Sequence, residues 1–398
     1  MFGIGASPKK DSCLIFDIGS GSIGAGLVDM TGSAPNVVWC NRQSFPPQVP
    51  EHLEFNRFMQ GMLSTLQTLC ESVQKEGLSK VPGRSLGKIY LIFASPWYIS
   101  QTTVLKFQHE KSVSVEPYFS EIKKMLEQKE AALAGATPGG SKALVIEKQI
   151  IEARLNGYPT AHPHGKVAHS FEAAVLTSML GMELYQQTAA IVHKTFGRNP
   201  SSLHSFALVS FATIRDIFAP EENFLLVDIG SEVTDIGVVR DDVLVDTISF
   251  PSGKNFILRA VAAALGITPQ EAQSRIELYR SGKSEAGESK KVVAALLAVE
   301  KEWQGAFEKA AGELTKTTTL PTALFLTADQ DLGEWFRVAL LEGNAKNLSE
   351  TGQALSVVLL TPEHFAKYIT FAPTVLPDPF IALEALFAQR IDQTLIVD

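Results

Sequence analysis

Two stretches of the chain share one arrangement: a short apolar run, a turn rich in glycine and serine, and a second apolar run. The first is LIFDIGSGSIGAGLVD, at Leu14–Asp29, and the second is LLVDIGSEVTDIGVVR, at Leu225–Arg240. They align without gaps and share seven identical positions. Apolar runs on both sides of such a turn predict the two strands of a hairpin. A further β-rich run follows each copy, at 37–44 and 243–250, so each copy is expected to open a mixed sheet.

Helical periodicity follows each predicted hairpin, and short apolar runs typical of strands follow the helices. Helices are predicted at 55–73, 256–265 and 269–279, and later strands at 89–93, 206–209 and 324–326. Strands and helices that alternate twice over indicate two α/β lobes. Because the lobes arise from a repeated unit, we expect them to share one architecture and to enclose a cleft.

Two segments interrupt this alternation and are interpreted as insertions. Between 111 and 178, a long charged helix, a Gly/Pro break and two β-like runs predict a small α+β subdomain. Between 287 and 315, a stretch rich in Ala, Glu and Lys predicts a long helix, and a final helix is predicted at 380–386. The predicted boundaries are 1–110 plus 179–221 for the first lobe core, 111–178 for the inserted subdomain, 222–256 plus 320–398 for the second lobe core and 257–319 for its helical insertion.

The composition narrows the class of protein. The chain has 398 residues, of which 45% are hydrophobic and 20% charged, as in globular proteins. Its net charge of −8 argues against nucleic acid as a partner, because nucleic-acid binders usually carry clustered Lys and Arg. Cys13, Cys40 and Cys70 lack the spacing of a metal or redox motif and fit reduced thiols in the cytoplasm. No segment approaches the ~18 consecutive apolar residues that a transmembrane helix needs.

The two Gly/Ser turns carry the candidate chemistry. Glycines in both turns let backbone N–H groups approach a phosphate closely, and the nearby hydroxyls can donate to it. The carboxylates of Asp17 and Asp228 end the preceding strands and can bind Mg²⁺, with water molecules completing its coordination. One such turn alone would indicate only a tight hairpin, whereas the duplication favours phosphate binding.

These motifs resemble the paired phosphate motifs of the actin-like ATPase superfamily, which includes actin, heat-shock ATPase chaperones and sugar kinases. LLVDIGSEVTDIGVV followed by ISFPSGKNFILRAVAAALGITPQEA is similar to the second phosphate motif of FtsA and the helix after it. RLNGYPTAHPHGKVAHSFEAAVLTS, at 154–178, resembles the subdomain inserted in FtsA and PilM. The resemblance implies an α/β, actin-like (ribonuclease H-like) duplicated two-lobe fold with an FtsA/PilM-type inserted subdomain, whose last helix returns to the first lobe.

The same resemblance implies that ATP and Mg²⁺ bind between the lobes, with Asp17 and Asp228 near the metal. The residues expected around the cofactor are Asp17, Gly19, Ser20, Gly21, Ser22, Asp228, Gly230, Ser231, Glu232, Thr234, Gly253, Thr327 and Ala328. No residue is assigned as a catalytic base, and at most a weak ATPase activity is expected.

The chain departs from the family's pattern at several positions. The family's adenosine motif is a Gly-Gly pair after an apolar strand, whereas TALFLTADQDLGEWF has Thr, Ala and Asp at 327–329. A second Gly-Gly pair is replaced by Ser-Gly at 252–253, and Gly24 lies where a lysine is often found. Two explanations stay open: weak nucleotide binding with little turnover, or a scaffold that has lost nucleotide binding.

The leading hypothesis is a cytoplasmic scaffold or assembly protein that acts in cell division at the inner membrane, with a tubulin-like division protein as partner. The alternative is a PilM-like role in type IV pilus assembly, with the tail of a pilus inner-membrane protein as partner. A nucleotide-free pseudo-ATPase scaffold and a small-molecule kinase are the further alternatives, and self-association is left open. The terminal QTLIVD lacks the basic amphipathic helix of FtsA-type proteins, so membrane contact is expected only through partners.

Overall fold

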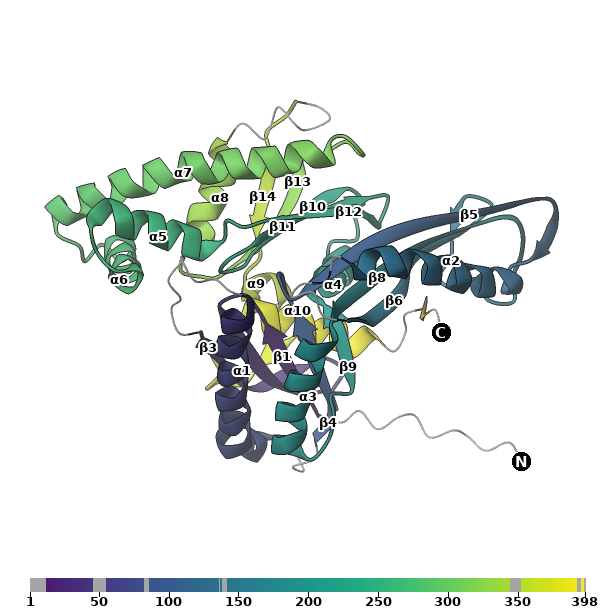
Figure 1. Cartoon of the computed structure of the whole chain (residues 1–398), viewed down its shortest axis with the longest axis horizontal. Helices are drawn as coiled ribbons and strands as arrows, with labels where there is room; N and C mark the ends of the chain where they lie inside the picture. Colours follow the sequence, from purple (N-terminus) through teal and green to yellow (C-terminus); the bar gives the residue numbers. More distant parts are fainter. Residues whose placement is uncertain are drawn as a thin grey trace.

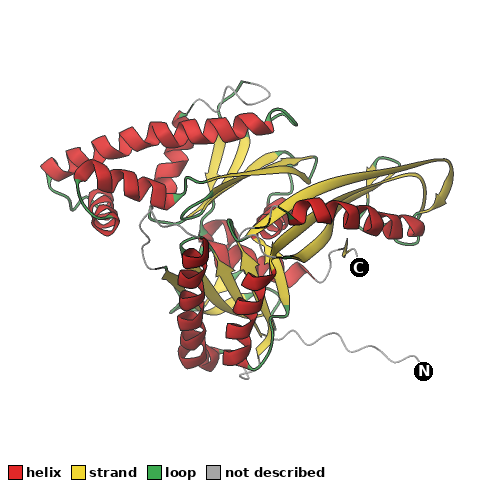
Figure 2. Cartoon of the chain, viewed as in Figure 1, coloured by secondary structure: helices red, strands yellow, loops and turns green. Residues whose placement is uncertain are grey.

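The structure is a computed structural model that describes residues 12–45, 55–81, 86–135, 137, 142–343, 352–391 and 395–396. In this part of the chain the strands form three sheets, named here the lobe-1 sheet, the lobe-2 sheet and the insert sheet. Figure 1 shows the lobe-2 sheet above the lobe-1 sheet, with the insert sheet projecting to one side. Figure 2 shows helices covering the sheets of both lobes, which is the α/β layering that the sequence predicted.

The lobe-1 sheet has the strand order β15-β3-β2-β1-β4-β9. Its strands are β1 Ser12–Ile18, β2 Ser22–Asp29, β3 Asn36–Ser44, β4 Leu86–Phe93, β9 Ser202–Ser205 and β15 Thr370–Phe371. β1, β2 and β3 form an antiparallel meander, while β1 pairs in parallel with β4, and β4 in parallel with β9. The sheet is therefore mixed, as predicted.

The lobe-2 sheet repeats this plan with the order β12-β11-β10-β13-β14. Its strands are β10 Phe224–Ile229, β11 Thr234–Arg240, β12 Val243–Phe250, β13 Ala323–Ala328 and β14 Ser356–Leu359. The antiparallel meander β10-β11-β12 is again followed by two parallel strands. The duplication predicted from the two turns is thus confirmed at the level of sheet topology.

Strand β1 is buried on both faces, which explains why its sequence is a continuous apolar run. Leu14 and Phe16 pack in the core under α1 Phe55–Ser72 and α3 Met182–Phe196. Cys13 and Ile15 point to the opposite face and pack with α10 Pro379–Arg390. The expected return of the last helix to the first lobe is therefore seen in the structure. Asp17 shares this second face, so α10 lies over the first candidate carboxylate.

Helix α4, Phe206–Ile217, replaces a predicted strand. The strand predicted at 206–209 is wrong: the strand is β9, and it ends at Ser205. Ser205 caps the helix, because its side chain accepts a hydrogen bond from the Leu208 amide. The run was misread because a short segment that is apolar on every side gives no periodicity to separate a buried strand from a buried helix.

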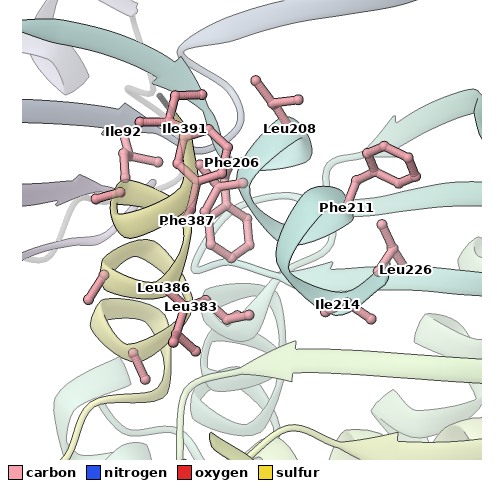
Figure 3. Packing of buried hydrophobic residues seen from close by; sticks show 14 of the residues in the cluster. Ile92, Phe206, Leu208, Phe211, Ile214, Leu226, Leu383, Leu386, Phe387 and Ile391 are labelled. Atoms are coloured by element: carbon pink, nitrogen blue, oxygen red, sulfur yellow. The ribbon is translucent and has the colours of Figure 1, made fainter. Parts of the chain in front are cut away.

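α4 packs between the two lobes. Figure 3 shows its side chains Phe211 and Ile214 facing Leu226 of β10, while Phe206 lies beside Phe387 of α10. Residues of both lobes thus share one apolar core. Burial of such a core is the main force that fixes the lobes relative to each other.

The insert sheet contains β5 Tyr98–Ser114, β6 Ala143–Leu155, β8 Val167–Gly181, β7 Tyr158–Pro159 and β16 Leu395–Ile396. The order is β16-β6-β8-β5, with β7 on β6, and α2 Glu116–Ala134 packs on one face. The helix and both β-like runs predicted at 111–178 are present. Tyr98 of β5 pairs with Leu180 of β8, so this sheet extends beyond the predicted boundaries at 111 and 178.

Helices cover the outer face of the lobe-2 sheet (Figure 1). Trp303, on one of these helices, is fully buried. These helices are α5 Lys254–Leu265, α6 Pro269–Arg280, α7 Ala286–Leu314 and α8 Gly333–Glu342. Elsewhere in the fold there are short helical elements: a π-helix at Val73–Gly77, a 3-10 helix at Leu78–Lys80 and α9 Pro362–Phe365. The predicted positions of α5, α6 and α7 are correct to within two residues at each end. Within the described residues, no helix combines the length and apolar character that crossing a bilayer requires.

Candidate functional site

A cavity of about 780 Å³ lies between the lobes, and both Gly/Ser turns line it. The first turn contributes Ser20 and Gly21, and the second contributes Ser231 and Glu232. The remaining wall comes from β3, α5, α6, the loop at 329–331 and the segment that leads into α10. The cleft expected between the lobes is therefore present, and it is large enough for a small molecule.

The two turns touch each other at the base of this cavity. The Ser20 hydroxyl accepts a hydrogen bond from the Glu232 amide at 2.9 Å. A Cβ atom added to Gly21 would lie only 2.2 Å from the Ser231 hydroxyl oxygen. Glycine is required at position 21 because the second turn leaves no space for a side chain. The structure thus brings the duplicated motifs together in one crevice.

Several amides of the turns are used inside the protein. The Gly19 amide donates to the Ser22 carbonyl at 3.1 Å, and the Gly230 amide donates to the Val233 carbonyl at 2.9 Å. These paired bonds explain why the two turns have the same shape. Trp97 also fixes the first turn, because its indole N–H donates to the Gly19 carbonyl at 2.7 Å.

The carboxylate of Asp17 pairs with Arg42, a residue that the sequence analysis missed. The Arg42 Nη2 atom lies 2.6 Å from Asp17 Oδ2, and its Nε atom lies 2.7 Å from Asp378 Oδ2. Its Nη1 atom donates to the Ser22 hydroxyl at 3.1 Å. The Asp17 side chain is only 5% exposed, so this ion pair is largely screened from solvent.

Glu384 of α10 is the third carboxylate beside Arg42. It is fully buried near the Asp17 carboxylate, and no described residue donates a hydrogen bond to its carboxylate oxygens. Burial, together with the neighbouring negative charge of Asp17, raises the pKa of Glu384 well above its usual range.

The second candidate carboxylate, Asp228, has different surroundings. It accepts a hydrogen bond from the Thr327 hydroxyl at 2.7 Å, and it lies directly opposite Asp235 of β11. Burial and then the charge of Asp235 raise the pKa of Asp228 well above its usual range. Both carboxylates line a smaller cavity of about 170 Å³, beside Tyr98 and Ser249. Asp17 and Asp228 therefore lie in separate environments.

Asp235→Asn is expected to stabilise the protein at pH 7 by on the order of 1 kcal/mol. Burial raises the pKa of Asp235, so the wild type loses stability as the pH rises above the ordinary pKa of an aspartate. Asn removes that charge and its repulsion of Asp228, and it can still accept the hydrogen bond from Ser249. Urea unfolding at pH 7 and pH 4 measures this: the gain should shrink at pH 4, and a loss of stability at pH 7 would contradict it.

The remaining predicted residues lie near the second turn. Thr327 and Ala328 belong to β13 and are buried, with Ala328 in the lobe-2 core. Thr234 is buried and donates to the Ser252 carbonyl at 2.9 Å. Gly253 packs against the backbone of the turn, since an added Cβ would lie 2.3 Å from the Gly230 carbonyl oxygen. These four residues therefore serve the structure of lobe 2.

Three further ion pairs are formed by residues that line the cavity. The Lys254 ammonium lies 3.0 Å from Asp329 and 2.6 Å from Asp331. Glu232 pairs with Arg259 at 2.9 Å and also accepts a hydrogen bond from Asn255. The sequence analysis noted Asp329 only as a departure from a Gly-Gly pair. Nothing in the local sequence marks it as a partner of Lys254, because 75 positions separate the two residues.

In this arrangement the residues do not fit Mg²⁺ and a triphosphate. Asp17 is held by Arg42, Asp228 is held by Thr327, and the two turns are hydrogen-bonded to each other. Among the residues that the structure describes, no group of three or more His, Cys, Asp or Glu side chains is placed to hold a metal ion. The cleft is thus built from internally paired charges.

Comparison with solved structures gives the fold. The chain superposes on a structure of the PilM-PilN type IV pilus biogenesis complex with a TM-score of 0.59 and 14% identity, covering 96% of this chain and 98% of that one. The ethanolamine utilization protein EutJ from Carboxydothermus hydrogenoformans gives a TM-score of 0.42 and 13% identity, with 94% and 88% covered. A protein of unknown function with an actin-like ATPase fold from Bacteroides thetaiotaomicron gives 0.40 and 11%, with 91% and 95% covered.

At the level of sequence, no family model and no curated protein matches the chain. The assignment therefore depends on the architecture: two lobes with the same sheet order, two Gly/Ser turns that meet in one cleft, and a superposition that covers 96% of the chain. The chain has the fold of the actin-like ATPase superfamily.

Proposed function

We propose that this chain is an actin-like assembly scaffold of the PilM type, which works through protein partners at the inner face of a membrane. The observation that carries the proposal is the superposition on a chain of the PilM-PilN complex, which covers 96% of this chain and therefore includes most of the insert. The insert sheet projects from lobe 1, where it offers a surface for partners (Figure 1). The division role expected from the sequence stays a prediction.

The pairing of the cleft carboxylates supports a scaffold over a kinase. Phosphoryl transfer to a small molecule needs a carboxylate placed to accept the acceptor's proton. Asp17, Glu232, Asp329 and Asp331, which lie in or beside the cleft, each have a cationic partner within 3.0 Å. Any of these four carboxylates would have to leave its ion pair before it could act as a general base.

A retention experiment tests the proposal. The immobilised chain is incubated with the cytoplasmic tail peptide of a pilus inner-membrane protein and, separately, with the tubulin-like division protein. We expect retention of the tail peptide only. Retention of the division protein alone would favour the division role, and retention of neither would overturn both.

Calorimetry tests nucleotide binding separately. We expect titration of Mg·ATP into the wild type to give no saturable heat at millimolar concentration, because the turns and carboxylates are already engaged. The control is the double variant Asp17→Ala, Asp228→Ala. Heat in the wild type that disappears in the variant would restore the Mg·ATP site predicted from the sequence, and turnover that rises with an added metabolite would favour a kinase.

A further inference from the structure

Arg42 makes three hydrogen bonds that close lobe 1 around its last helix. Its Nη2 and Nε atoms bind carboxylates of two elements that are far apart in the sequence, β1 through Asp17 and the start of α10 through Asp378. Asp378 also caps α10, because it accepts hydrogen bonds from the amides of Phe380 and Ile381. The guanidinium therefore connects the first turn's carboxylate to the helix that covers it.

The strand register explains how Arg42 reaches Asp17. Asp17 of β1 lies opposite Gly24 of β2, and Gly24 lies opposite Arg42 of β3. A Cβ atom on Gly24 would lie 2.7 Å from the Arg42 Nη2 atom. The guanidinium thus crosses β2 above Gly24, which has no side chain to block it. Its planar shape lets it bind a carboxylate on either side.

The carboxylates that Arg42 binds explain why a cation is needed at this place. Arg42 pairs with the carboxylates of Asp17 and Asp378 beside α10. Glu384 of α10 is fully buried and close enough to Asp17 and Arg42 to interact with their charges. Buried carboxyl groups gathered in this way are stable only beside a positive charge or as neutral acids.

We infer that Arg42 is a built-in cation that takes the place of a divalent metal at Asp17, so that lobe 1 closes on α10 without Mg²⁺ or nucleotide. The corresponding row of lobe 2 is Asp228, Asp235 and Ser249, which has no arginine. The use of an arginine in place of a metal ion is therefore specific to lobe 1 and does not follow from the duplication. The inference goes beyond the proposed function, and it can fail while the partner experiment succeeds.

The test removes the guanidinium and supplies metal ions alone. Arg42→Ala leaves the carboxylates of Asp17 and Asp378 without their cation, so MgCl₂ or MnCl₂ should raise its melting temperature by about 3 °C or more in a saturable way. Its dissociation constant for Mn²⁺ should be at least about tenfold lower than that of the wild type. The wild type should show no saturable shift.

Arg259→Ala is the matched control, because Arg259 also lies in the cleft but pairs with a single carboxylate, Glu232. It should show no rescue by metal. If Arg42→Ala does not fold, Arg42→Gln is used, since it removes the charge but keeps a polar side chain. The inference is overturned if the wild type binds Mn²⁺ and loses it on Asp17→Asn, or if neither Arg42 variant responds to metal more than Arg259→Ala does.

Discussion

Trp97→Ala is expected to lower the free energy of unfolding by about 3–5 kcal/mol, the usual cost of removing a large buried aromatic side chain. Trp97 is fully buried and stacks on Phe58 of α1, with ring centroids 4.7 Å apart. Its indole N–H also holds the Gly19 carbonyl at 2.7 Å. The variant should therefore loosen the first turn as well as the core, which urea unfolding and amide exchange near Gly19 would both record.

Trp97→Phe separates these two contributions. Phenylalanine can keep the stack on Phe58 but lacks the indole N–H, so we expect a loss of about 1 kcal/mol, the net worth of one hydrogen bond. Faster amide exchange near Gly19 should appear in both variants. Equal losses of stability in the two variants, or a loss below about 1 kcal/mol for alanine, would contradict the assignment of Trp97 as the main support of this turn.

The repeat was the part of the fold most accessible from the sequence. A turn of glycine and serine between apolar runs has few backbone solutions, so two such turns predicted two equivalent meanders, and the sheets have that order. The segment at 206–209 failed because its surroundings, and not its own sequence, decide its conformation. Helix α4 is apolar on several sides since it packs between α10 and the lobe-2 sheet (Figure 3).

The extent of the insert was harder to predict for a related reason. The pairing of β5 with β8 begins at the lobe-1 border, where Tyr98 lies opposite Leu180, and it is irregular between Gln108 and Val113. The helical and β-like patterns of the sequence start only after this irregularity, so the part of β5 before it was left in the first lobe. The predicted bounds at 111 and 178 followed the charged helix and the last β-like run instead.

The candidate site likewise contains residues that local motifs reveal and one residue that they do not. The Gly/Ser motifs were enough to name Asp17, Gly21, Gly230 and Ser231 as candidate site residues, and the structure brings the two turns together. Arg42 could not be assigned, because its pairing with Asp17 depends on the register of two neighbouring hairpin strands. The pairing register of these strands is set by which residues are buried and by the geometry of the turns. The spacing of residues along the sequence does not determine it. The glycine at 24 was the single local signal.

Gly253→Ala is expected to destabilise the protein by about 3 kcal/mol, at the upper end of the cost of overpacking. The added Cβ would lie 2.3 Å from the Gly230 carbonyl oxygen and 2.7 Å from backbone atoms of Ser231. Backbone has less freedom to move than the end of a side chain. The amides of Gly253, Lys254 and Asn255 also donate to the carbonyls of this turn, so any shift weakens those bonds too.

Gly305→Ala makes the same chemical change where space is open, within α7 and with no atom within 4 Å of the added Cβ. Replacing an interior helix glycine with alanine should stabilise the protein by about 0.5–1 kcal/mol. Urea unfolding of both variants should therefore give opposite signs. The same sign for both would mean that glycine at 253 is not needed for contact with the second turn, and Gly253 would return to being a candidate ligand-binding residue.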